Sequence, residues 1–349
     1  METALHRLLL AIVAAIACAV LPAQAQKADE SLFEYRGADR MDRIIVAAKK
    51  EGTVTVYASI AQTDMNSLVH MFETQYGIKV NVWRSGSDEV LYRAITETNA
   101  KTYKVDLIYD PVTELEALSR ENILQPLNSP TFKDLQPGSV SKKQDRANVL
   151  ISVFVQGYNT KALKKKDLPK SFKDLLDPKW KGKLGIEAKE ASWFGATVKA
   201  MGDEAAGIKL FHDIAAKNGI SMRKGHSLMK NMVIAGEVPL SLTVYTYMVD
   251  QAKRKGAPID WFAIEPVIAR ANAIGVARHA PHPNAALLFY EFLLGTDAQK
   301  LFASLDYEPS NTRVESPLKN LKYTLIDPVV ALDERAKWET LFDNTMMAK

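Results

Sequence analysis

Three times in succession, a short β-branched run is followed by a segment with helical periodicity, and this alternation is the strongest constraint on the fold. The strand-like runs cover residues 53–57, 78–82 and 105–109, and apolar residues at helical spacing follow each of them. Such an order predicts an α/β domain with a parallel sheet and right-handed crossovers. In sheets of this kind, ligands bind beyond the carboxyl ends of the strands.

That rule selects the three loops that follow these strands as candidate binding segments. The second loop reads Arg84-Ser-Gly-Ser-Asp88 at the start of a predicted helix, where hydroxyls and free backbone N–H groups suit an anion. In a purely structural role, Ser87 would only cap that helix. The candidate ligand-binding residues of these loops are Ser59, Ser85, Gly86, Ser87 and Asp110.

The rest of the chain repeats the mixture of strands and helices. Strand-like runs occur at 149–155 and 238–244, with helical periodicity between them. A chain of 349 residues exceeds the size at which one core usually stops growing, so we expect two lobes. The lysine-rich segment 161–183 predicts a solvated surface, or alternatively a surface that docks on a membrane partner.

The first 25 residues have the pattern of a cleaved secretory signal peptide. Arg7 precedes an apolar run at residues 8–20, and Ala23-Gln-Ala25 forms the cleavage site. The alternative is a membrane anchor, but the run is shorter than the roughly 20 residues needed to span a bilayer. The only cysteine, Cys18, lies in this segment, and no Leu stands three residues before it to favour lipidation. We therefore expect an exported mature chain without thiolate chemistry or Cys-bound zinc.

Charge and motifs exclude several classes of function. A formal net charge of +4, from 45 Lys+Arg and 41 Asp+Glu, is too small to indicate a nucleic-acid partner. The sequence has no G-x-S-x-G, Walker, G-x-G-x-x-G or H-E-x-x-H motif. The close pair His279 and His282 lies among prolines, which favours a surface loop over a metal site. These observations favour a binding protein, with an exported α/β enzyme as the alternative class.

Three stretches of the chain carry a family resemblance. They lie within residues 52–110, 157–185 and 235–293, and the most specific part is Pro169-Lys-Ser-Phe-Lys-Asp-Leu-Leu-Asp-Pro-Lys-Trp-Lys-Gly-Lys183. The sequence resembles the periplasmic solute-binding proteins of ABC importers, in particular the subgroup similar to ferric-ion-binding proteins.

This resemblance implies the type II periplasmic-binding-protein fold, in which two α/β lobes close on a solute in an interlobe cleft by a hinge motion. On that template, residues 26–147 and 270–305 form one lobe, and residues 148–269 and 306–349 form the other. It also implies a soluble periplasmic monomer that delivers its solute to an inner-membrane ABC permease. No enzymatic activity, cofactor or nucleic-acid partner is expected.

The identity of the solute depends on the second lobe. The ferric-binding relatives use an adjacent pair of tyrosines, whereas Tyr245 and Tyr247 are separated here by one residue. Residues i and i+2 of an extended segment point the same way, so both would bind Fe³⁺ if iron were the transported ligand. The first loop carries no His, so we favour a small anionic or phosphorylated organic solute. The expected second-lobe contacts are Trp193, His226, Ser227, Tyr245 and Tyr247, with Arg84 and Lys224 as countercharges.

Overall fold

The computed structural model describes residues 30–347, so the predicted signal peptide at residues 1–25 lies outside the described residues. The strands are β1 Thr53–Ala58, β2 Lys79–Arg84, β3 Leu107–Pro111, β4 Ala147–Asn159, β5 Leu184–Glu187, β6 Ile220–Arg223, β7 Leu240–Tyr245, β8 Ile259–Phe262, β9 Ile268–Val276, β10 Glu308–Pro309 and β11 Thr324–Leu325. The α-helices are α2 Glu30–Glu34, α3 Arg40–Glu51, α4 Gln62–Tyr76, α5 Ser87–Asn99, α6 Val112–Arg120, α7 Ala191–Ala200, α8 Glu204–Asn218, α9 His226–Ala235, α10 Thr246–Arg254, α11 Pro283–Leu294, α12 Thr296–Ser304, α13 Pro328–Asp333 and α14 Arg335–Met346. Short 3₁₀ turns are η1 Pro130–Asp134, η2 Lys165–Asp167, η3 Phe172–Leu176 and η4 Pro178–Trp180.

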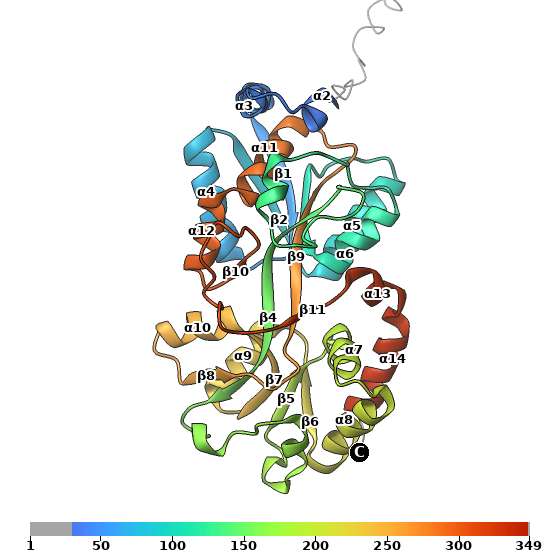
Figure 1. Ribbon diagram of the computed structural model, residues 1–349, viewed down its shortest axis with the longest axis vertical. Helices are drawn as coiled ribbons and strands as arrows, with labels where there is room; N and C mark the ends of the chain where they lie inside the picture. The colour runs from blue at the N-terminus through green and yellow to red at the C-terminus, as the bar shows by residue number, and fades with distance from the viewer. Residues whose placement is uncertain (1–29, 348–349) are drawn as a thin grey trace, which may run out of the picture.

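These elements form two α/β lobes connected by long strands (Figure 1). The main strand order is β2-β1-β3-β9-β4-β7-β5-β6. In the first lobe, β1 pairs in parallel with β2 and β3, as the alternation of strands and helices predicts. In the second lobe, β5 pairs in parallel with β6 and β7. The predicted α/β fold with two lobes is confirmed.

Two strands, β4 and β9, pass from one lobe to the other through the narrow middle of the molecule (Figure 1). They pair with each other in antiparallel fashion, and β4 is buried along all 13 of its residues. Leu150 of β4 packs in the core of the first lobe, whereas Phe154 packs in the core of the second. The two lobes are therefore held by a shared pair of strands, which is where a hinge motion would bend the chain.

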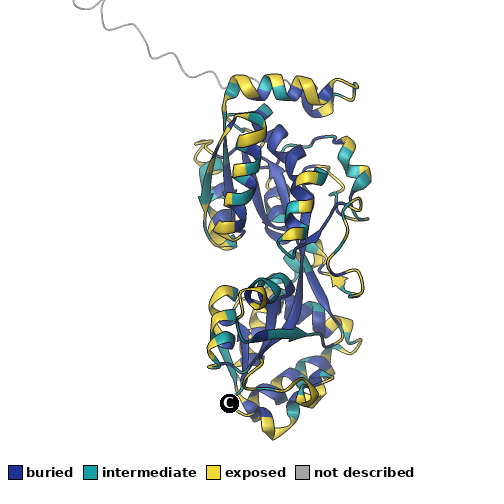
Figure 2. Cartoon of the chain, turned by 90° about the vertical axis from the view of Figure 1, so that its left-hand side faces the viewer, coloured by how far each residue is buried: buried dark blue, intermediate teal, exposed yellow. Residues whose placement is uncertain are grey.

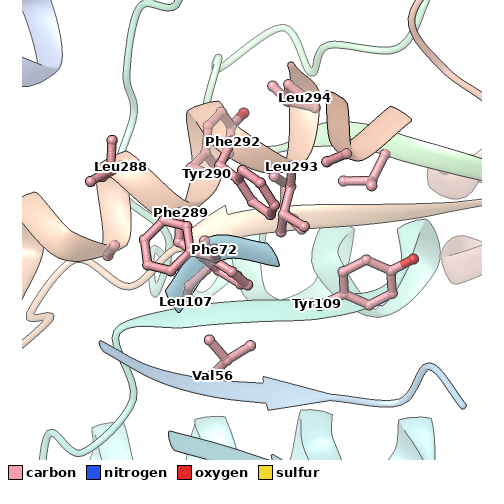
Figure 3. Close-up of a cluster of buried hydrophobic side chains, with 14 of the residues drawn as sticks. Val56, Phe72, Leu107, Tyr109, Leu288, Phe289, Tyr290, Phe292, Leu293 and Leu294 are labelled. Carbon is pink, nitrogen blue, oxygen red and sulfur yellow. The ribbon is translucent and has the colours of Figure 1, made fainter. Parts of the chain in front are cut away.

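The core of the first lobe lies between the sheet and the helices that cover it. Helix α11 is buried along almost its whole length and packs on α3 and β1. Its Phe289 meets Phe72 of α4 edge to face, with ring centroids 4.8 Å apart (Figure 3). The central strands, such as β4 and β7, are buried, whereas the outer faces of the helices are exposed (Figure 2). This burial is what the hydrophobic periodicity predicts.

The C-terminal segment touches both lobes. Tyr307 packs in the core of the first lobe, α13 lies against α6, and α14 then packs on α7 and α8 of the second lobe. Trp338 of α14 covers Gly195 of α7, where an added Cβ would come within 2.5 Å of the indole ring. The predicted lobe boundaries, including the one between residues 305 and 306, stay predictions.

Candidate functional site

A cleft of about 1400 Å³ lies between the two lobes. Its walls come from loops and helix starts of both lobes and from the crossing strands β4 and β9. The C-terminal segment closes one side of the cleft with residues of α13 and α14. A concave site between two lobes, lined by both, is the usual location of a small-molecule site.

Six helices of the two lobes, namely α4, α5, α6, α7, α9 and α10, contribute residues of their first turns to the cleft lining, as do α13 and α14 of the C-terminal segment. None of the six has a side-chain hydrogen bond that caps its N-terminus. The first N–H groups of a helix have no partner within the helix, and the helix dipole places partial positive charge there. The cleft therefore presents a set of backbone donors that favours an anion.

In the first lobe, Ser59, Gly86 and Ser87 line the cleft. The Arg84 side chain also lies there, and its Nε donates to the backbone oxygen of Ile60 at 3.2 Å. Ser85 is not among the lining residues. Its backbone N–H donates to the Ala58 oxygen at 3.1 Å and so extends the pairing of β1 with β2. The serine loop therefore faces the cleft through Gly86 and Ser87.

A polar cluster occupies the opposite wall. His226 Nε2 lies 2.5 Å from Glu190 Oε1, and Arg270 Nη2 lies 3.8 Å from the same oxygen. Arg270 also donates to the hydroxyl of Tyr245. Burial by itself would raise the pKa of Glu190, but the charges of Arg270 and His226 outweigh it and hold that pKa below its ordinary value. Glu190 is therefore an ionised carboxylate inside the protein.

Aromatic rings form a continuous stack along the cleft. The Tyr245 ring lies 4.3 Å from the His226 ring and 5.6 Å from Tyr247, and Tyr247 lies 4.0 Å from Tyr307, measured between centroids. Tyr307 donates from its hydroxyl to Asp64 Oδ2 at 2.6 Å. Burial raises the pKa of both Tyr245 and Tyr247, so both are neutral phenols at pH 7.

Buried acids stand behind the first-lobe loops. Asp110 is fully buried, and burial together with the charge of Glu114 raises its pKa well above its ordinary value. Burial also raises the pKa of Glu114, although Arg335 and Arg270 oppose that rise. Arg335 of α14 contacts Glu114 Oε1 at 2.9 Å, which joins the C-terminal segment to the first lobe.

One group of side chains among the described residues has the spacing of a metal site. Glu187, Glu190 and His226 each offer a ligand atom, and these atoms lie within 4.8 Å of one another. Both oxygens of Glu187 already accept backbone hydrogen bonds, from Gly225 at 2.7 Å and from Lys189 at 2.6 Å. The adjacent guanidinium of Arg270 already supplies positive charge to this group.

The structure brings most of the predicted ligand-binding residues to one cleft. Lining residues include Ser59, Gly86, Ser87, His226, Ser227, Tyr245 and Tyr247, together with the predicted countercharges Arg84 and Lys224. Asp110 lies beneath this surface, fully buried. The expectation for Trp193 differs from the structure, because its indole is 1% exposed and packs on Phe172 and Phe211 in the second core. The buried face of α7 carries Trp193, while Ser192 faces the cleft.

Sequence reasoning did not identify Arg270, Glu187, Glu190 or Tyr307. Arg270 had a signal, since it is a lone cation within the apolar strand Ile268–Val276. A charged residue in a buried strand requires a partner, which marks it as a candidate for a polar site. Glu190 and Tyr307 are ordinary residues of loops in the sequence, and only the fold brings them to the cleft.

The chain is similar to several known proteins. Residues 67–322 match the family model described as bacterial extracellular solute-binding protein. The chain is 25% identical over 305 residues to the major ferric iron-binding protein of Neisseria gonorrhoeae, covering 80% of this chain and 86% of that protein. It is 26% identical over 281 residues to iron uptake protein A1 of Synechocystis, covering 73% of this chain and 74% of that protein.

Solved structures share the fold. Iron-bound HitA from Pseudomonas aeruginosa superimposes with a TM-score of 0.72 at 21% identity, over 84% of this chain and 99% of that one. AfuA from Actinobacillus pleuropneumoniae, with exogenous fructose-6-phosphate bound, gives 0.75 at 20% identity, over 86% and 100%. Among residues 30–347, no helix combines the length and apolar character needed to cross a membrane.

Proposed function

The chain belongs to the bacterial extracellular solute-binding proteins, and from this premise we propose that it captures a small anionic organic solute in the periplasm for an ABC importer. Members of such a family bind and deliver solutes and are not enzymes. The observation that carries the choice of an anion is the convergence of six helix N-termini, without side-chain caps, on one cleft. Ser59 and Ser87 add hydroxyl donors to these backbone N–H groups.

Delivery requires that the solute contact both lobes. A ligand that touches both walls binds the closed arrangement more tightly than the open one, and so shifts the population toward closure. The serine loop of the first lobe and the His226 wall of the second lobe supply the two halves of this contact. The permease would then distinguish the closed protein from the open one.

Ferric iron is the second candidate. Relatives named for ferric iron binding favour it, and so does the position of Tyr245 and Tyr247, which both line the cleft. Against it, the Tyr245 hydroxyl accepts from Arg270, and burial raises the pKa of both phenols, which disfavours the phenolate that Fe³⁺ needs. We therefore rank iron below an organic anion.

A thermal-shift screen of the mature protein tests the choice. The panel contains phosphorylated sugars, phosphonates and carboxylates, with ferric citrate as the iron arm. A solute at about 100 times its Kd stabilises the folded protein by about 2.7 kcal/mol, which raises the Tm by several degrees. Loaded iron would colour the protein through phenolate-to-iron charge transfer.

Two variants test the proposed contacts. Ser87→Ala removes a hydroxyl at the first-lobe wall and Tyr247→Phe removes one at the second, and each should reduce the shift produced by an anionic solute. A full shift in both variants would contradict the assigned site. A reddish protein that is stabilised by ferric citrate and by no organic anion would replace the proposed solute with iron.

A further inference from the structure

Three buried polar atoms in the cleft wall of the second lobe have no hydrogen-bond partner among the described residues: Glu190 Oε2, His226 Nδ1 and Arg270 Nε. All three side chains line the cleft, and that of Glu190 is only 2% exposed. A buried polar group without a partner costs about 1–3 kcal/mol. Three such atoms on three separate segments, each in a residue that lines the same cleft, point to a ligand that supplies the missing partners.

The chemistry of these atoms restricts what the ligand offers. Glu190 Oε2 is a carboxylate oxygen and only accepts, whereas Arg270 Nε only donates. His226 Nε2 lies 2.5 Å from a carboxylate oxygen and carries the proton that faces it, while Nδ1 accepts in the neutral ring and donates in the imidazolium. The wall therefore needs a ligand that donates to Glu190 Oε2, accepts from Arg270 Nε and can do either at His226 Nδ1.

A hydroxyl both donates and accepts through one oxygen atom. One ligand hydroxyl could donate to Glu190 Oε2 while accepting from Arg270 Nε, and a neighbouring hydroxyl could donate to His226 Nδ1. A carboxylate or a fully ionised phosphate only accepts hydrogen bonds, so at the same place it would leave Glu190 Oε2 without a partner. The anionic group of the solute therefore belongs at the other wall, beside Gly86 and Ser87.

A metal ion is the competing occupant of this wall, because Glu187, Glu190 and His226 have suitable spacing. Arg270 argues against it. Its guanidinium lies 3.8 Å from Glu190 Oε1, so it already compensates the carboxylate charge, and it would repel a second cation. Glu187 is also occupied at both oxygens by backbone N–H groups.

We infer that the solute is a polyhydroxylated organic anion, of the sugar-phosphate or sugar-acid class, whose hydroxyls bind Glu190, His226 and Arg270. This inference rests on the proposed function and specifies its substrate. The cleft, at about 1400 Å³, has room for such a molecule together with water. The two sources of the negative charge, phosphate and carboxylate, are separated by the experiment.

The experiment is calorimetric titration of the mature protein with matched anions. Glucose 6-phosphate, ribose 5-phosphate, glycerol 3-phosphate and gluconate are compared with hexyl phosphate and hexanoate, which keep the charge but lack hydroxyls. We expect at least one hydroxylated anion to bind about 100-fold or more tighter than its alkyl counterpart, since a site built for hydroxyls rejects analogues that lack them. Whether that ligand is a phosphate or gluconate identifies the anionic group.

Variants assign the effect to the wall. Glu190→Gln keeps the shape and removes an acceptor charge, so it should weaken the hydroxylated ligand about 10-fold or more and leave hexyl phosphate within about twofold. Arg270→Lys keeps the charge and removes the Nε donor, and should show the same selectivity. Glu315→Gln, at a carboxylate that is 80% exposed and is not part of the cleft lining, is the matched control and should change neither affinity. Circular dichroism verifies that each variant is folded.

The outcomes separate this inference from the proposed function. Equal affinity for hydroxylated and alkyl anions would overturn the inference and leave the anion-binding function intact. Failure of every anion, alkyl or hydroxylated, would overturn both. Binding of Mn²⁺, Zn²⁺ or Fe³⁺ without any anion, lost in Glu190→Gln, would also overturn both and assign the wall to a metal.

Discussion

Arg270→Met is the substitution with the largest expected effect on the stability of the second lobe. In the folded protein the Arg270 guanidinium donates a hydrogen bond to the Tyr245 hydroxyl and compensates the negative charge of Glu190, whose side chain is 2% exposed. Removing one partner of a buried ion pair costs up to about 3–5 kcal/mol, because the remaining charge is less well compensated, and here Glu190 keeps His226 at 2.5 Å. An exposed pair such as Arg120 with Asp333 is worth about 0–1 kcal/mol, so Arg120→Met is the control.

The loss should depend on pH in a defined direction. In the wild-type protein the folded pKa of Glu190 is depressed, so this residue contributes stability above its unfolded pKa that is lost as the pH falls through the folded pKa. Without Arg270, burial still raises the folded pKa of Glu190 and only His226 is left to lower it, so this pKa rises from its wild-type value. Glu190 therefore contributes less stability to the variant than to the wild-type protein at neutral pH, and this difference shrinks as the pH falls through the two folded pKa values.

Urea unfolding followed by tryptophan fluorescence measures this, since Trp180, Trp193 and Trp338 all lie in the second core. We expect Arg270→Met to lose up to about 3–5 kcal/mol at pH 7.5 and at least about 1 kcal/mol less at pH 5. Adding Glu190→Gln should recover part of the loss at pH 7.5. A loss below about 1 kcal/mol, or one that is equal at both pH values, would refute the charge compensation described here.

Three further substitutions test packing and the buried charges. Gly195→Ala places a Cβ 2.5 Å from the Trp338 ring, and the resulting overpacking should cost about 1–3 kcal/mol in thermal unfolding. The buried Arg40 lies 2.7 Å from a carboxylate oxygen of Glu291, and Glu291→Gln removes this counter-ion. Urea unfolding should then show a loss of about 3–5 kcal/mol in the free energy of unfolding. A loss under about 1 kcal/mol would contradict the ion pair. Trp193→Phe should cost about 1–3 kcal/mol of stability and leave the solute Kd unchanged. A higher Kd with unchanged stability would instead show that Trp193 contacts the solute.

Much of the first lobe was predictable because its signals are local. Parallel strands at residues 53–57 and 78–82 alternate with amphipathic helices, and the structure has β1 and β2 there in parallel register. The loops after those strands meet at the cleft because carboxyl ends of parallel strands share one edge of the sheet. Ser59, Gly86 and Ser87 were therefore identifiable before the fold was known.

Trp193 shows where a local signal fails. The triplet Ser192-Trp-Phe194 lies in the first turn of α7, and which of its side chains faces solvent depends on how that helix is rotated against the rest of the lobe. Packing on Phe172 and Phe211 turns the indole inward, and Ser192 is left at the cleft. Burial of the larger apolar side chain decides this rotation, and its partners are distant in the sequence.

By itself, the sequence determined the α/β character, the two lobes and the serine-lined half of the cleft, because hydrophobic periodicity and strand-end loops are properties of neighbouring residues. Only the tertiary structure decided which polar side chains meet in the opposite wall. Glu190 and His226 are 36 residues apart, and Arg270 comes from a strand that crosses between the lobes. Arg270 and His226 each carry a signal in their own segments, but their meeting with Glu190, and the unsatisfied polar atoms that point to a hydroxylated solute, exist only after folding has removed all three from water together.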